Sequence, residues 1–137
     1  MRNVFCKHTL LALVVSAVAG VPLAAQAAGG HTHATPHGGV VVQVAQHHIE
    51  FKADSSGLIA VWVLDEAMKL TAAPSDASVT LMPEGGAQIV LPLKPAASGG
   101  GLTARFEPTK LPAFHAVVSL LIGGKRHNVR FNYPAPH

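Results

Sequence analysis

Cysteine is nearly absent from this chain of 137 residues, and the single one, Cys6, lies close to the N-terminus. The rest of the chain therefore has no thiolate metal ligand, no disulfide and no cysteine nucleophile. Any metal chemistry there depends on histidine, carboxylate and methionine. Charged residues make up only 12% of the sequence and form no basic stripe interleaved with aromatics, so we predict no binding to nucleic acid.

Enzyme motifs are also missing. The sequence has no G-x-S-x-G elbow, no phosphate-binding loop and no H-E-x-x-H pair. The adjacent acids Asp65 and Glu66 would point to opposite faces of a strand, which makes them a poor acid–base pair and is more typical of a turn. We therefore expect a protein that is not an enzyme.

The first 27 residues have the pattern of a secretory signal peptide. Arg2 and Lys7 precede the apolar run "TLLALVVSAVAGVPLA", and "AQA" then supplies small residues for cleavage after Ala27. The alternative, a transmembrane anchor, would require a longer run. Cleavage would leave a periplasmic chain, 28–137, with eight basic and seven acidic residues, a net charge of +1 and no stable membrane insertion.

Short β-rich segments separated by turn signals follow Gly39, and no long amphipathic helix interrupts them. The expected strands are 40–44, 48–53, 58–64, 77–82, 87–93, 102–108, 116–122 and 126–133. This pattern predicts one all-β domain over 39–134, an immunoglobulin-like β-sandwich of seven to eight short antiparallel strands, with a partly closed barrel as the alternative. Segment 65–76 fits either one helical turn or a short strand and corner, and 94–101 is expected to be a loop.

A flexible, histidine-rich arm, 28–38, is expected before the domain. His31, His33 and His37 lie on this arm, where Gly, Thr and Pro allow the chain to bend. Imidazole suits copper, zinc and nickel, so the arm is a candidate metal-binding segment. A solvated tail without a ligand is the alternative.

A second group of candidate ligands lies in strand 48–53. Alternation predicts His48 and Glu50 as exposed neighbours. Such a pair can serve one ion, or the glutamate can orient the histidine, and a surface cross-strand pair without a ligand is the alternative. His47 would face the edge of the core. If 40–45 pairs antiparallel with this strand, His37 lies about 17–20 Å from His48. A single shared site then requires the arm to fold back, and two separate sites are the alternative.

Several of these elements resemble a small periplasmic domain that occurs alone or near the N-terminus of heavy-metal efflux adaptor (membrane-fusion) proteins. The similarity rests on "PHGG" at 36–39, the His48-x-Glu50 pair, the "LIAVWVLD" strand and Lys69, and covers about residues 36–70. The family pattern usually has a Gly-Lys-Pro-type turn where this chain has "AMKLTAAP". The resemblance implies a β-sandwich that handles transition metals, with His37, His48 and Glu50 as functional candidates.

Two functions follow from these observations. In the first, the domain binds a transition-metal ion (copper, zinc, nickel or cobalt) and passes it to a heavy-metal efflux adaptor or pump. In the second, it is a structural or interaction module of the cell envelope with no metal role. The remaining histidines fit packing or surface positions better, and His127 is expected to be partly buried because it shares a face with Val129 and Phe131.

Overall fold

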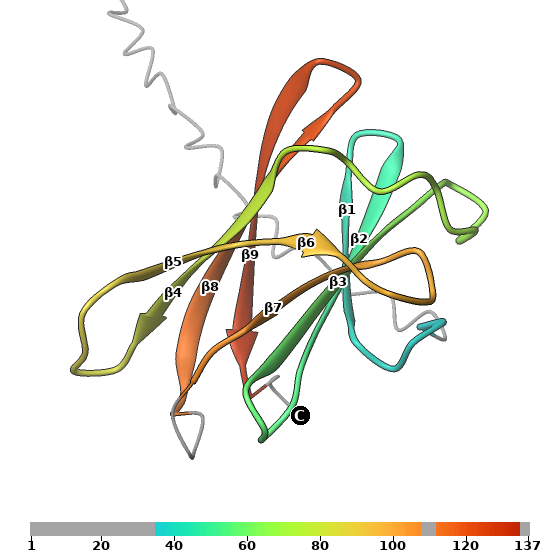
Figure 1. The fold of residues 1–137 in the computed structure, drawn as a ribbon. Helices are drawn as coiled ribbons and strands as arrows, with labels where there is room; N and C mark the ends of the chain where they lie inside the picture. Colours follow the sequence, from blue (N-terminus) through green and yellow to red (C-terminus); the bar gives the residue numbers. More distant parts are fainter. Residues whose placement is uncertain (1–34, 108–111, 135–137) are drawn as a thin grey trace, which may run out of the picture.

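The computed structural model describes residues 35–107 and 112–134 (Figure 1). The predicted signal peptide and the arm histidines His31 and His33 lie outside the described residues. Within the described part, no helix is long and apolar enough to cross a membrane.

In the described part of the chain, nine strands form two antiparallel sheets that pack face to face (Figure 1). One sheet has the order β1-β2-β3-β7-β6 and the other the order β5-β4-β8-β9. The strands are β1 (Val40–Val44), β2 (His47–Ala53), β3 (Leu58–Leu64), β4 (Ala77–Pro83), β5 (Ile89–Pro92), β6 (Lys94–Pro95), β7 (Leu102–Arg105), β8 (Phe114–Ile122) and β9 (Lys125–Tyr133). The predicted all-β sandwich of short antiparallel strands is confirmed, and its strand order differs from that of immunoglobulin domains.

The strand that sequence reasoning missed is β6, which lies within the expected loop 94–101. The chain changes sheets at Leu93, a buried residue whose N–H donates to the Ala77 carbonyl at 3.0 Å. Lys94 and Pro95 then pair with β7. Two residues that include a proline carry too little pattern to indicate a strand.

The core lies between the sheets and is built from the inward positions of nearly every strand. Its rings cluster around Phe51, which stacks on Phe131 at 4.8 Å between centroids and meets Phe114 edge-on at 6.5 Å. The fully buried aliphatic side chains include Ile49, Ile59, Val61, Leu81, Leu102 and Leu120. Strand β3 is buried on both faces over most of its length, as its continuous apolar sequence predicts.

The ambiguous segment 65–76 contains a tight turn and no helix. Asp65 organises this turn, because its carbonyl accepts from the Met68 N–H at 3.0 Å and its Oδ1 accepts from the Lys69 N–H at 2.8 Å. Met68 has a φ of 61°, in the left-handed region that favours glycine. The turn therefore forms here despite an unfavourable residue.

We predict that Met68→Gly is more stable than Met68→Ala by about 1 kcal/mol, because only glycine adopts this φ without a steric cost. Comparing the two variants removes the same side chain from both and so isolates the backbone effect. Urea denaturation followed by Trp62 fluorescence measures the difference. A glycine variant less stable than the alanine variant would contradict the prediction.

Candidate functional site

Glu50 lies in the middle of β2 and is completely buried, with an exposure of 0%. It occupies an outward position of the sheet, between Val41 of β1 and Trp62 of β3. The sequence prediction that Glu50 is an exposed surface residue was therefore wrong. The face was assigned correctly by alternation, but the N-terminal segment covers it.

Three N–H groups of this segment satisfy the Glu50 carboxylate. Oε1 accepts from the backbone N–H of His37 at 3.0 Å and of Gly39 at 2.8 Å, and Oε2 lies 2.9 Å from His37 Nδ1. No Lys or Arg forms a salt bridge with Glu50 within the described residues. A buried carboxylate needs such partners, because removing a charge from water without them is costly.

The segment folds back because of its two glycines. Gly38 has a φ of 74°, and its N–H donates to the Thr35 carbonyl at 3.2 Å. A Cβ on Gly39 would lie 2.5 Å from the Phe51 carbonyl oxygen, so only glycine brings the backbone within reach of Glu50. These are the glycines of the "PHGG" motif, and they attach the end of the predicted flexible arm to the sheet.

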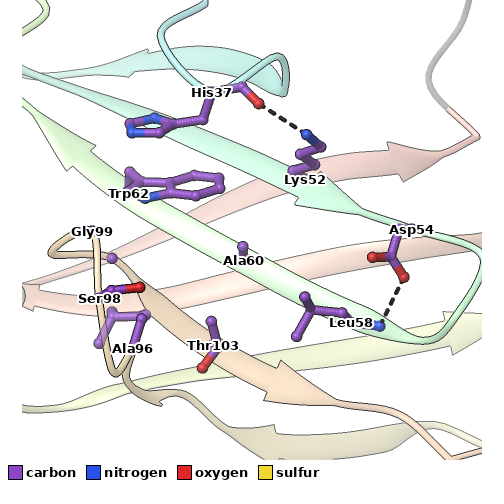
Figure 2. Close-up of a pocket in the computed structure, with 12 residues that line it drawn as sticks. His37, Lys52, Asp54, Leu58, Ala60, Trp62, Ala96, Ser98, Gly99 and Thr103 are labelled. Carbon is purple, nitrogen blue, oxygen red and sulfur yellow. Dashed lines mark hydrogen bonds between the residues drawn. The ribbon is translucent and has the colours of Figure 1, made fainter.

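The His37 ring stacks on the indole of Trp62 (Figure 2). The ring centroids are 4.1 Å apart and the planes differ by 2°. Lys52 adds a third support, because its Nζ donates to the His37 carbonyl at 3.0 Å. The imidazole is thus fixed in position by a carboxylate, an aromatic ring and a backbone contact.

These contacts define the proton position on the imidazole. An ionised carboxylate only accepts hydrogen bonds, so Nδ1 of His37 carries the proton and donates to Glu50. In the neutral imidazole Nε2 then holds a free lone pair, and it makes no hydrogen bond to any described residue. Because the side chain is 30% exposed, this nitrogen is a candidate ligand for a metal ion.

The other candidate histidines of β2 lie elsewhere. The Nδ1 of His48 is 3.1 Å from the Asp65 carbonyl oxygen, and its side chain is half-buried. His47 lies at the edge of the core, as predicted, and its Nδ1 is buried without a hydrogen-bond partner among the described residues. The expected cooperation of His48 with Glu50 is not seen, since Glu50 bonds His37 instead.

No three His, Asp or Glu side chains of residues 35–107 and 112–134 come together as a metal-binding group. The structure unites His37 with Glu50 and leaves His47 and His48 apart from them. His127 is half-buried, as predicted, while His115 is exposed and its Nδ1 lies 2.7 Å from Asn132 Oδ1.

Sequence reasoning missed Trp62 and Lys52 as parts of this site. The available signal was alternation, because Trp62 has the outward parity of β3 and Lys52 has that of β2. The short "DSSG" turn also predicts that these two strands are neighbours. Neither signal fixes the register, which places Trp62 directly opposite Glu50.

A cavity of about 310 Å³ adjoins the His37–Trp62 stack (Figure 2). Its floor is formed by outward side chains of β3 and β7, and the loop before β7 closes one side, held by the Ala96 N–H bond to the Gly101 carbonyl at 2.8 Å. Asp54 lies at the other end. Hydrogen bonds to its carboxylate, first of all from the Ser56 hydroxyl, hold the pKa of Asp54 below its usual value.

Comparisons with known proteins gave no match, whether with family models, curated proteins or solved structures.

We predict that Glu50→Gln lowers the free energy of unfolding by about 1.5–3 kcal/mol, because the charge-assisted hydrogen bonds to His37 and Gly39 are weakened in a buried site. Chemical denaturation measures the loss. Glu66→Gln is the matched control, since Glu66 is exposed and its substitution should change stability by less than about 0.5 kcal/mol. Equal effects of the two substitutions would show that the Glu50 contacts contribute nothing.

Proposed function

We propose that this protein is a periplasmic transition-metal-binding protein without enzymatic activity, and that Nε2 of His37 is its central ligand. One observation carries the proposal: Glu50 bonds Nδ1 of His37 and Trp62 stacks on its ring, which leaves Nε2 without a partner among the described residues. Histidines that bind metals almost always donate their other N–H to a carboxylate or carbonyl in this way.

Metal binding is supported by the preorganisation of the His37 ring. A surface histidine loses rotamer freedom when it binds an ion, whereas His37 is already held by its stack on Trp62 and its bond to Glu50. The buried carboxylate also raises the electron density on the imidazole and strengthens it as a ligand. Both effects favour metal binding over a merely solvated histidine.

The remaining ligands in this proposal come from the arm. His33 and His31 precede His37 by four and six residues, which is close enough for a bent chain to bring their rings to the same ion. A set of imidazoles without thiolates suits copper, zinc, nickel or cobalt. The protein would hold such an ion after removal of residues 1–27 and deliver it to a heavy-metal efflux adaptor or pump.

An envelope interaction module is the second candidate. The observation that favours it is an apolar position on an edge strand, because Val90 of β5 is 60% exposed. Exposed apolar edges are suited to pairing with another protein. The metal titrations below distinguish the two functions.

We predict that the chain from residue 28 binds Cu(II), Zn(II) or Ni(II) with a Kd below about 10⁻⁵ M, corresponding to more than about 7 kcal/mol of binding free energy. Isothermal titration calorimetry measures the affinity. His37→Ala should weaken it at least about tenfold by removing the fixed ligand. His115→Ala is the control, because His115 is an exposed histidine on the other sheet. Affinity weaker than about 10⁻⁵ M for all three metals would refute the proposed function.

We predict that replacing both His31 and His33 by Ala also weakens binding at least about tenfold, because a single imidazole forms only a weak site. His48→Ala should leave the affinity nearly unchanged, since His48 bonds the Asp65 carbonyl and not the His37 group. Calorimetry with the metal that binds tightest provides the comparison. If instead His48→Ala abolished binding and the arm variant did not, the ligand set would lie on β2 and the His37 site would be wrong.

A further inference from the structure

The cavity beside Trp62 has features that metal coordination by His37 does not use. It lies on the outer face of β2, β3 and β7, where Figure 2 shows Ala60 and Leu58 along its floor and Trp62 at one end. Its volume of about 310 Å³ is at the lower end of the 300–1,000 Å³ range of small-molecule sites. The space therefore fits a small ligand with an apolar body.

Two opposite charges line the same side of this cavity. Lys52 and Asp54 lie two residues apart in the chain, so their Cα atoms are about 7 Å from each other in extended chain. Lys52 uses one N–H for the His37 carbonyl and has two more to donate. The Asp54 carboxylate accepts its hydrogen bonds within the described residues on Oδ1, from Ser56 and from the Leu58 N–H, which leaves Oδ2 free.

From this arrangement we propose that the cavity binds a free α-amino acid with an apolar side chain. The ligand's carboxylate would pair with the Lys52 ammonium and its ammonium group with Asp54 Oδ2. Its side chain would then lie over Ala60 against Trp62. This function goes beyond metal binding and does not depend on it.

The residues that line the cavity favour a ligand that is small and zwitterionic. A ligand of one charge would satisfy either Lys52 or Asp54 and would meet the like charge of the other, which lowers its affinity. Glycine at 101 keeps the loop close to the indole, because a Cβ there would lie 2.5 Å from Trp62 Nε1. The side chain of Ala60 is short, and this preserves the space above the floor.

The test is a titration of the chain from residue 28 with L-leucine in the presence of EDTA, so that no metal contributes. Trp62 is the only tryptophan, and its fluorescence reports on occupancy of the cavity. Calorimetry measures the affinity in parallel. We expect saturable binding with a Kd below about 1 mM. N-acetyl-L-leucine lacks the ammonium charge, L-leucine amide lacks the carboxylate and glycine lacks the apolar body, so each should bind at least about tenfold more weakly.

Two conservative variants identify the residues responsible. Asp54→Asn keeps an oxygen acceptor for the turn but loses the charge, and Lys52→Met keeps the aliphatic stem; each should weaken L-leucine binding about tenfold or more. Glu66→Gln and Lys125→Met are the matched controls, because both residues are exposed and neither lines the cavity. All four substitutions are at exposed positions, so urea denaturation should show folded variants.

Three results would overturn the proposal: no saturable binding of L-leucine up to about 10 mM, equal binding of the blocked derivatives, or unchanged binding in Asp54→Asn. Each of these results can be distinguished from a failure of the metal-binding proposal. Loss of metal binding in His37→Ala leaves Asp54 in place, and Asp54→Asn leaves the His37–Glu50 pair intact.

Discussion

The burial of the Glu50 carboxylate is the constraint on which the site depends. A negative charge at 0% exposure on the outer face of a sheet requires donors, and this chain supplies them from the segment that precedes β1. That requirement brings His37 over Trp62, and it places the Gly39 backbone against the Phe51 carbonyl. The His37 stack in turn forms one wall of the adjoining cavity.

A gain in net stability does not by itself explain why the Glu50 carboxylate is buried. Moving a charge out of water costs several kcal/mol, and the interactions that the charge gains inside a protein often only offset that cost. Removal of one partner leaves the other unpaired and is destabilising. What the buried charge does achieve is a single geometry for His37, and this is the property that a ligand position needs.

The sequence predicted the strands well because each had a clear period or a clear turn. Alternation located β2, the apolar run located β3, and the Gly123-Gly124 pair, both with positive φ, located the β8–β9 hairpin. Prediction failed where contacts between distant segments decide the outcome. The exposure of Glu50 depends on a segment more than ten residues away, and β6 exists only because β7 is there to pair with it.

The separation of His37 from His48 is a second case in which contacts between distant segments decide the outcome. The expected antiparallel pairing of β1 with β2 is confirmed, and it places His37 at the Lys52 end of β2. The segment does fold back, but only as far as Glu50, while His48 bonds the Asp65 carbonyl of the next turn. Pattern reasoning showed that the segment has to fold back for a shared site, but it could not show which residue of β2 the segment reaches. The close approach of Gly39 to the Phe51 carbonyl determines that residue.

Strand β2 serves the fold and the site through alternate residues. Ile49 and Phe51 face the core, whereas Glu50 and Lys52 face the site. Since the period is two, a register slip of one residue would bury Lys52 in the core and expose Phe51. The packing that stabilises the sandwich therefore also maintains the spacing of the outward groups. For this reason we expect substitutions in the core half of β2 to disturb the site only by unfolding the domain, whereas outward substitutions alter binding with the fold retained.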